Sequence, residues 1–345
     1  MKAVVVHGAG DLRVEELPDP EPASGQVLLA VEWGGICGSD LAYVAQGISG
    51  TAILKEPMIL GHESTARVVS WGDDVEGLEA GQKVAIYPPT LVGDGVLPQR
   101  LAGRTNLYPQ VRYLGSAAML PHTGGALAEL IVVRPDQLVA LPDSLDTRLG
   151  ALAEPLSVAL HAVRRVESLL AGGVAGRDVL VNGSGPIGLL AASVAKRLGA
   201  NSVTAADVAP QALKLARQIG ADHTVNVQQE PFGSEFEVVI EASGVAAALG
   251  GVLRTTARGG VMIQVGNLPA DQVTAVLGDL VSREIVWAGS FRFAGEMPEA
   301  VQLLADGLPV EPLITHTYPV ADALEAFRVA ADRQAGSSKV LIQFD

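Results

Sequence analysis

Basic residues are scarce in this sequence: 24 Lys and Arg stand against 38 Asp and Glu, and the net charge is −14. That charge argues against nucleic acid and anionic membrane surfaces as partners. No apolar run reaches the roughly 18 residues that a membrane span needs, and residues 1–8 read as a short strand, not a signal peptide. The single cysteine, Cys37, excludes a disulfide within the chain. We therefore expect a cytoplasmic protein without a membrane or nucleic-acid partner.

What the sequence does contain is enough apolar material for two domains. Its 345 residues, 48% hydrophobic and 18% charged, exceed what one core usually organises. Residues 1–150 hold short apolar runs separated by Gly, Pro and Asp, which predicts a mostly β domain. From 151 to 287 strand and helix patterns alternate, which predicts an α/β domain with a doubly wound parallel sheet. The strands of that sheet are predicted at residues 178–183, 202–207, 223–227, 236–242, 260–266 and 285–290.

The tail of the sequence, residues 288–345, is predicted to return to the first domain. It contains helical patterns at 296–306 and 320–332 and a closing strand at 339–344. The α/β domain, residues 151–287, is then an insertion between the two parts of a catalytic domain. Residues 87–121 have no clean period and are predicted to form a long lobe or loop, which in a compact domain tends to be functional or to be the remnant of a former feature.

The stretch around Gly183 carries a phosphate-binding pattern. Gly183, Gly185 and Gly188 form G-x-G-x-x-G after an apolar run that suits a buried parallel strand. They permit a tight turn, close approach of a pyrophosphate, and close helix packing. Pro186 suits the first turn of a helix whose N-terminus offers N–H groups to phosphate. Asp207 ends the next predicted strand, where a carboxylate accepts the ribose 2′-hydroxyl, so NAD is predicted over NADP. The alternative is a tight turn beside an ordinary aspartate.

Three side chains from two separate segments of the sequence have the chemistry of zinc ligands. Cys37 lies in a glycine-rich segment, and His62 and Glu63 follow Gly61. Thiolate, imidazole and carboxylate together suit a Zn²⁺ with an open coordination position. Adjacent residues on a strand point to opposite faces, so joint ligation by His62 and Glu63 needs a bend, which Gly61 allows.

Two further acids are candidates for the same site. Asp40, three residues after Cys37, is a plausible partner for the far nitrogen of His62. Glu154 begins the crossing into the second domain and could ligate the metal or hold its bound water. Against these roles, a single cysteine is more often a small buried hydrophobe, and a lone histidine is more often a hydrogen-bonded core or surface residue. Spacing alone leaves these alternatives open.

Taken together, the motifs resemble those of the zinc-dependent medium-chain dehydrogenase/reductase family over nearly the full length of the chain. The segments that carry the resemblance are residues 35–40, 60–63, 153–159 and 183–188. The segments that are similar to the polyol branch of the family are residues 112–117, 121–125 and 289–293. The resemblance implies a GroES-like β domain that carries the metal and a Rossmann domain that carries NAD.

For function, the resemblance implies hydride transfer to NAD from a secondary hydroxyl of a polyol or of a sugar acid such as L-idonate. It implies zinc ligation by Cys37, His62 and Glu63, with Glu154 holding water or exchanging onto the metal. It places Ser39, Asp40 and Glu154 in catalysis, with Ser39 accepting the leaving proton. Substrate contacts are implied at Tyr43, Glu154, Arg292 and Phe293. NAD contacts are implied at Ile187, Asp207, Val265, Gly266 and Asn267. We expect a homo-oligomer, either a dimer or a tetramer.

Several of these roles have alternatives. Arg292 suits a terminal carboxylate of the substrate or the diphosphate of NAD, and His122 could bind substrate or cap a turn. The reaction also has rivals, namely oxidation of sorbitol, galactitol, L-threonine or another secondary alcohol. Outside that class stand a zinc-free NADPH-dependent enone reductase and a non-catalytic nucleotide-binding protein.

The sequence departs from the family pattern in three places. The four cysteines of the family's structural zinc site are matched by Asp94, Leu97, Arg100 and Tyr108. That set cannot form a thiolate cage, so one catalytic zinc and no structural zinc are predicted. Ala66 replaces a signature glycine, which is a small change. Ala42 stands where relatives often carry the histidine that ends a proton relay, so a proton from Ser39 would leave through water or the cofactor ribose.

Overall fold

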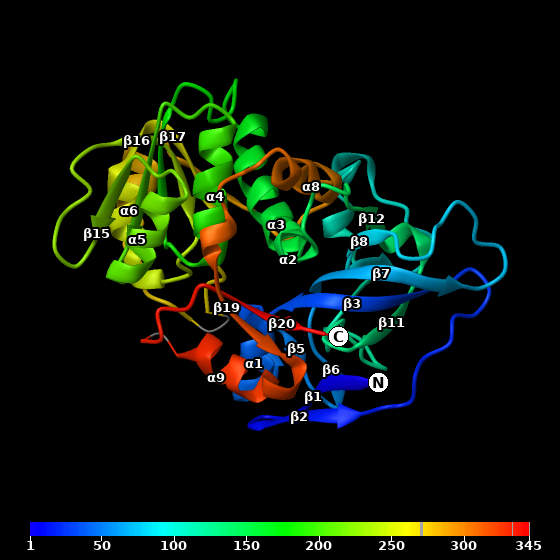
Figure 1. Cartoon of the computed structure of the whole chain (residues 1–345). Helices are drawn as coiled ribbons and strands as arrows, with labels where there is room; N and C mark the ends of the chain where they lie inside the picture. Colours follow the sequence, from blue (N-terminus) through cyan, green and yellow to red (C-terminus); the bar gives the residue numbers. More distant parts are fainter. Residues whose placement is uncertain (270–271, 333, 345) are drawn as a thin grey trace. The chain divides into compact units, whose positions relative to one another are not determined.

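The computed structural model describes residues 1–269, 272–332 and 334–344 and contains two compact units (Figure 1). Unit 1 comprises Met1–Glu154, Met297–Asp306 and Ile314–Asp345. Unit 2 comprises Pro155–Glu296 and Gly307–Leu313. The chain therefore passes from unit 1 into unit 2 and returns to unit 1 twice.

Unit 1 is organised around strand β3 (Val27–Gly35), on which Val27, Leu29 and Val31 alternate into the core. Its main sheet has the order β12-β8-β7-β3-β20-β19, and β11 also pairs with β3. The other bounds are β7 Glu63–Trp71, β8 Lys83–Ile86, β11 Leu130–Val133, β12 Leu138–Ala140, β19 Ile314–Pro319 and β20 Lys339–Gln343. Strand β20 pairs antiparallel with β3 and lies beside it in Figure 1, so the last strand of the chain joins the sheet of unit 1. The predicted domain bounds, 1–150 with 288–345 and 151–287, stay predictions. Strand β19, parallel to β20, was not predicted.

Shorter elements complete unit 1. Its remaining strands are β1 Lys2–Gly8, β2 Asp11–Glu16, β4 Ile48–Ser49, β5 Ala52–Ile53, β6 Met58–Ile59, β9 Pro89–Leu91 and β10 Val111–Tyr113. Its helices are α1 Gly38–Gln46, α2 Thr147–Gly150, α8 Met297–Ala305 and α9 Ala323–Ala331, and α3 Ala153–Arg164 begins in unit 1 and continues in unit 2. The mostly β character predicted for residues 1–150 is confirmed, and the predicted tail helices correspond to α8 and α9.

Unit 2 is a parallel sheet with the strand order β15-β14-β13-β16-β17-β18, which confirms the predicted doubly wound α/β sheet. Its strands are β13 Asp178–Asn182, β14 Ser202–Asp207, β15 His223–Asn226, β16 Phe236–Glu241, β17 Thr256–Gln264 and β18 Val286–Gly289. Its helices are α4 Pro186–Arg197, α5 Pro210–Gln218, α6 Leu249–Thr255 and α7 Gly278–Ser282, and Figure 1 shows α4, α5 and α6 flanking the sheet. The sheet core consists of fully buried apolar side chains such as Leu180, Val239 and Met262.

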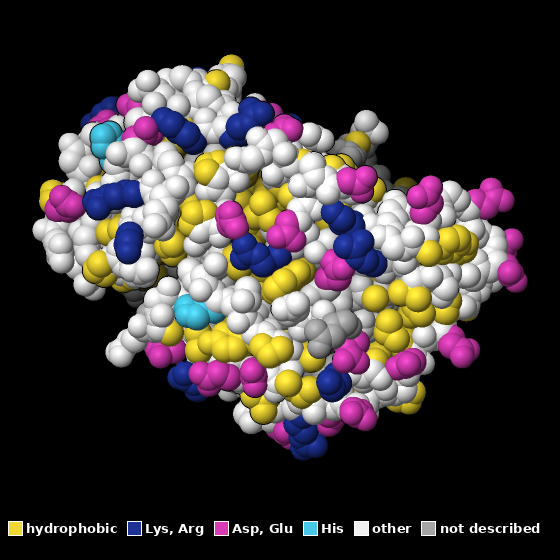
Figure 2. Space-filling view, in the orientation of Figure 1, with side chains coloured by type: hydrophobic (Ala, Val, Ile, Leu, Met, Phe, Trp, Pro, Cys, Tyr) yellow, Lys and Arg dark blue, Asp and Glu magenta, His cyan; other side chains and the backbone are white. Residues whose placement is uncertain are grey.

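Charged side chains of both signs are interspersed over the face shown in Figure 2, where the described residues form no continuous basic surface. This distribution agrees with the net charge of −14. In the described part of the chain, no helix combines the length and the apolar character that crossing a membrane requires.

Candidate metal centre and dinucleotide site

Cys37, His62 and Glu63 come together in unit 1. One potential ligand atom from each side chain lies within 4.8 Å of the other two, and among the described residues no other trio of His, Cys, Asp or Glu does so. Cys37 precedes the first turn of α1. The predicted bend is present, because Gly61 has φ +93° and Glu63 then begins β7. A Cβ at Gly61 would lie 2.4 Å from the side chain of Leu127, so only glycine fits there.

Asp40 supports this trio through the backbone. Its carboxylate is fully buried and accepts hydrogen bonds from the backbone N–H groups of Cys37 at 2.9 Å and Gly61 at 3.2 Å. It therefore ties together the two segments that carry the ligands. Its Oδ1 lies 4.0 Å from Nδ1 of His62, which is longer than a hydrogen bond. Asp40 is therefore near the imidazole of His62, as predicted, but the two side chains form no hydrogen bond in this structure.

The imidazole of His62 is buried among acidic groups. Burial is the largest influence on the pKa of His62 and lowers it, but Cys37, followed by Asp40, outweighs burial and raises the pKa well above its usual value. Nδ1 of His62 is a buried polar atom without a hydrogen-bond partner in the described part of the chain. A buried, unsatisfied ring nitrogen beside a thiol and a carboxylate is the arrangement that a metal ion would complete.

Glu63 has a buried partner that sequence reasoning missed. Nζ of Lys339, at the start of β20, lies 2.8 Å from Oε1 and 2.6 Å from Oε2 of Glu63. Both side chains are almost fully buried, with 3% and 1% exposed. Burial lowers the pKa of Lys339, but the charge of Glu63 outweighs it and the pKa is raised. The one signal in the sequence was a lysine opening the apolar run of the closing strand.

Glu154, on the first turn of α3, lies next to the same cluster. Oη of Tyr113 donates a hydrogen bond to its Oε1 at 2.5 Å, and the Tyr113 ring meets the His62 ring edge-on, with centroids 5.5 Å apart. Burial raises the pKa of Glu154, and His62 opposes that effect. Tyr113 lies in residues 112–117, a segment similar to the polyol branch, but the sequence predicted no role for it. The contact links residues 41 positions apart, which spacing alone does not reveal.

The other predicted residues of unit 1 have different surroundings. Ser39 is half-buried in the first turn of α1, two residues after Cys37. Tyr43 is buried, and its Oη accepts the N–H of Ala117 at 3.0 Å. Both ring nitrogens of His122 are used: Nε2 accepts the N–H of Lys55 at 2.9 Å, and Nδ1 lies 2.8 Å from the carbonyl oxygen of Met119. The substrate roles of Tyr43 and His122 stay predictions.

Arg292 and Phe293 lie in unit 2, just after β18. Arg292 has φ +50°, and its guanidinium carbon is 4.9 Å from the centroid of the Phe291 ring, while Phe293 is buried. This segment is fastened by Glu296, whose Oε1 lies 2.5 Å from Nδ1 of His161 on α3 and whose Oε2 accepts the N–H of Ala294 at 2.7 Å. The backbone that presents Arg292 is therefore held at a fixed point four residues later.

The glycine turn of unit 2 has the geometry that a dinucleotide needs. Gly183 has φ +96°, and a Cβ at Gly188 would lie 1.8 Å from the carbonyl oxygen of Gly183. Helix α4 begins after Gly185 with Pro186 in its first turn, so its N-terminus is open to an anion. Oδ2 of Asp207 accepts the N–H of Ser184 at 2.7 Å, which fixes the carboxylate beside the turn. Each carboxylate oxygen has two lone pairs, so Asp207 can still accept a ribose hydroxyl.

The remaining predicted NAD residues follow β17 at the same edge of the sheet. Backbone N–H groups of Val265 and Gly266 both donate to the carbonyl oxygen of Glu241 at 2.9 Å. A Cβ at Gly266 would lie 2.4 Å from the nitrogen of Gly244, and a Cβ at Gly244 would lie 2.4 Å from the carbonyl oxygen of Asn267. These loops are therefore packed backbone against backbone. Ile187 is half-buried in the first turn of α4. The cofactor contacts of these residues stay predictions.

The lobe that lacks cysteines is held by hydrogen bonds. Oη of Tyr108 donates to Oδ1 of Asp94 at 3.2 Å, and the same Asp94 oxygen accepts the N–H of Val96 at 2.9 Å. Leu97 and Arg100 lie between these two residues, and Arg100 is exposed. The lack of a structural zinc stays a prediction. In the described residues, hydrogen bonds between Asp94, Val96 and Tyr108 connect the two ends of this segment.

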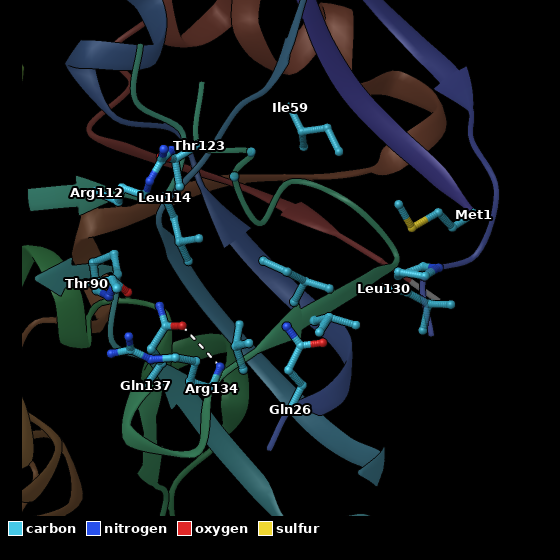
Figure 3. Close-up of a pocket in the computed structure, with 17 residues that line it drawn as sticks. Met1, Gln26, Ile59, Thr90, Arg112, Leu114, Thr123, Leu130, Arg134 and Gln137 are labelled. Carbon is cyan, nitrogen blue, oxygen red and sulfur yellow. Dashed lines mark hydrogen bonds between the residues drawn. The ribbon is translucent and has the colours of Figure 1, made fainter. Parts of the chain in front are cut away.

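A pocket of about 450 Å³ in unit 1 lies among different residues (Figure 3). Strand β11, Arg112, Thr123 and Gln137 contribute to its lining, and Nη1 of Arg112 donates to the carbonyl oxygen of Pro121 at 2.8 Å. None of the predicted site residues lines it. The wall of this pocket is mostly apolar, and the three side chains of the candidate metal centre lie elsewhere in unit 1.

Comparisons with known proteins agree with these features. Residues 23–143 match the family described as "Alcohol dehydrogenase GroES-like domain", and residues 186–306 match "Zinc-binding dehydrogenase". A sorbitol dehydrogenase of Gallus gallus is 36% identical over 360 residues, covering 99% of this chain and 96% of that protein.

Two solved structures from Escherichia coli share the fold over the whole chain. L-idonate 5-dehydrogenase is 35% identical with a TM-score of 0.91, covering 99% of this chain and 98% of that one. Galactitol-1-phosphate dehydrogenase is 30% identical with a TM-score of 0.86, covering 99% and 100%.

Proposed function

Since the chain belongs to the zinc-dependent medium-chain dehydrogenase/reductase family, we propose that it oxidises a secondary hydroxyl of a sugar acid, L-idonate, with NAD. It is a zinc-dependent polyol or alcohol dehydrogenase that acts on CH–OH donors with a nicotinamide cofactor. The observation that carries the proposal is the convergence of Cys37, His62 and Glu63 within 4.8 Å. A zinc-free reductase would have no need of this trio.

In this proposal Cys37, His62 and Glu63 hold the zinc, and Glu154 stands beside them. Bound zinc would supply a Lewis acid that lowers the pKa of the substrate hydroxyl toward neutral pH. Ser39 would relay the proton of that hydroxyl: it accepts the proton while it gives up its own hydroxyl proton to water or to the cofactor ribose. Tyr113 fixes Glu154 by its hydrogen bond to Oε1, so the carboxylate keeps a defined orientation next to the reacting group.

Unit 2 would bind NAD along the edge formed by the glycine turn and the loop after β17. The N-terminus of α4 offers its N–H groups to the pyrophosphate. Asp207 accepts the ribose hydroxyl and repels a 2′-phosphate, so NAD is preferred over NADP. When bound, NAD accepts the hydride, and the protein supplies position and electrostatics.

The choice of L-idonate rests on two points. Arg292 carries a guanidinium that could bind the carboxylate of a sugar acid, and the chain is 35% identical to the L-idonate 5-dehydrogenase of Escherichia coli. A guanidinium is suited to a terminal carboxylate because it can donate two parallel hydrogen bonds. Sorbitol is the alternative substrate, because the sorbitol dehydrogenase of Gallus gallus is 36% identical. Galactitol and L-threonine are further alternatives within the same reaction class.

A panel of polyols and aldonates tests the proposal. We expect L-idonate to give the highest kcat/KM with NAD, read as NADH absorbance, and NADP to be a poorer cofactor. D-Gluconate is the matched control. It has the same terminal carboxylate but a different stereochemistry, so activity with it would show recognition of the charge alone. A higher kcat/KM with sorbitol or galactitol would replace L-idonate as the substrate, and a preference for NADP would contradict the role of Asp207.

Removal of the metal should separate activity from folding. We expect about one zinc per chain and complete loss of oxidation after chelation, with the thermal unfolding transition of the lobe and the sheet preserved. The physical reason is that Asp94 and Tyr108 close the lobe without thiolates. Circular dichroism before and after chelation, together with elemental analysis, gives the measurement. Unfolding on chelation would show that a second, structural metal had been overlooked.

A further inference from the structure

Lys339 is the buried cation of the candidate metal centre. Its Nζ contacts both carboxylate oxygens of Glu63, at 2.6 and 2.8 Å, and the carbonyl oxygen of Ile36 at 3.3 Å. An ammonium has three donors, so these three contacts satisfy it completely. A lysine buried to this degree is stable only when it is paired.

The charges around Lys339 are those that would surround a metal ion. Besides Glu63, Cys37 and Glu154 attract the ammonium electrostatically. Gly35 leaves the necessary room, because a Cβ there would lie 2.3 Å from Oε2 of Glu63. The carboxylate of Glu63 therefore pairs with the ammonium of Lys339 on β20. It is also one of the three groups, with Cys37 and His62, that could bind a divalent cation.

We propose that Lys339 is the counter-cation of this centre: it neutralises Glu63 when no zinc is bound, competes with zinc for that carboxylate, and so sets the zinc affinity. The inference rests on the proposed zinc site. Lys339 acts through Glu63 and is a positioning residue. Two effects have the same sign. The ammonium repels a nearby divalent cation, and repulsion in a buried site is weakly screened. It also occupies lone pairs of Glu63 that zinc would use.

The test is the dissociation constant of zinc, measured on the full chain by competition with a chromophoric chelator. For Lys339→Met we expect zinc to bind at least about tenfold more tightly than in the unmodified chain, which corresponds to roughly 1.4 kcal/mol. Lys339→Gln removes the charge but can still donate to Glu63, and it should shift the constant in the same direction if the methionine variant does not fold. Lys339→Arg keeps the charge and should stay close to the unmodified value.

Lys196 is the matched control. Its Nζ also contacts both oxygens of one carboxylate, Asp222 at 2.7 and 2.8 Å, but on the surface of unit 2. Lys196→Met should therefore leave the zinc affinity unchanged. The cobalt-substituted protein gives a second readout, because loss of Lys339 should change the ligand-field spectrum of the metal whereas loss of Lys196 should not.

The outcomes separate the two proposals. An unchanged or weaker zinc affinity in folded Lys339→Met or Lys339→Gln overturns the counter-cation role, even if the unmodified chain binds zinc and oxidises alcohols. An unmodified chain that binds no zinc overturns the proposed function itself. In a Glu63→Gln background the effect of Lys339→Met should shrink, because the two residues no longer form a charged pair, and an undiminished effect would also contradict the mechanism.

Discussion

Substitution of Cys37 by alanine is expected to abolish alcohol oxidation while NAD binding by unit 2 persists. Cys37 offers the thiolate of the candidate trio, and its replacement leaves His62 and Glu63 as two ligands. Two ligands hold zinc poorly. The Lewis acid contributes several kcal/mol to the reaction, so kcat/KM should fall by at least about 10³-fold.

Three measurements on this variant make the prediction specific. Elemental analysis should show loss of zinc, kinetics should show loss of turnover, and fluorescence titration should show an unchanged dissociation constant for NAD. Ser64→Ala is the matched control, because it truncates a small buried residue beside Glu63 whose hydroxyl has no partner in the described part of the chain. It should keep both zinc and activity. If Cys37→Ala turns over substrate as fast as Ser64→Ala, the zinc mechanism is wrong.

Replacement of Gly188 by alanine is expected to destabilise unit 2 and to disrupt NAD binding. A Cβ at position 188 would lie 1.8 Å from the carbonyl oxygen of Gly183, so α4 has to move away from the turn. Overpacking costs about 1–3 kcal/mol and occasionally more, and a clash with rigid backbone belongs at the upper end. Because the turn and the helix N-terminus form the phosphate site together, NAD affinity should fall by on the order of 100-fold, or about 2.7 kcal/mol.

Gly185 in the same motif is the control for this prediction. It has φ −70°, and a Cβ there would meet no atom within 4 Å. Gly185→Ala should therefore keep the unfolding temperature, although its methyl group faces the predicted pyrophosphate path and weakens NAD binding. Thermal unfolding and NAD titration of both variants decide the matter. Equal stability of the two variants would contradict the packing argument, and unchanged NAD binding in both would remove the dinucleotide site from this turn.

Local patterns predicted much of the fold. The strands of unit 2 were identifiable because apolar runs covered on both faces, such as the run before Gly183, alternate with helical periods. Strand β19 was missed because Ile314–Pro319 is mostly polar and half-buried and ends in proline, so it has neither a continuous apolar run nor a regular alternation. The start of β17 at Thr256 precedes the predicted start at 260, because two glycines interrupt the apolar pattern there.

The candidate site was predictable where its chemistry lies in short motifs. Cys37, His62 and Glu63 each stand in a distinctive segment, and the bend at Gly61 followed from the need to aim adjacent side chains together. The partners of the two glutamates were not predictable in this way. Lys339 and Glu63 are 276 positions apart, and Tyr113 and Glu154 are 41 apart, so only the folded chain brings them into contact.

Strand β20 has a consequence for the order in which the protein assembles on the ribosome. It supplies Lys339 to a sheet whose neighbouring strand, β3, is made more than 300 residues earlier. At about 5–20 residues per second, synthesis of the chain between β12 and β20 takes roughly ten to forty seconds. During that interval the nascent chain already carries Cys37, His62 and Glu63 but lacks the ammonium. A metal ion captured cotranslationally would therefore meet a more anionic cluster than the finished protein presents.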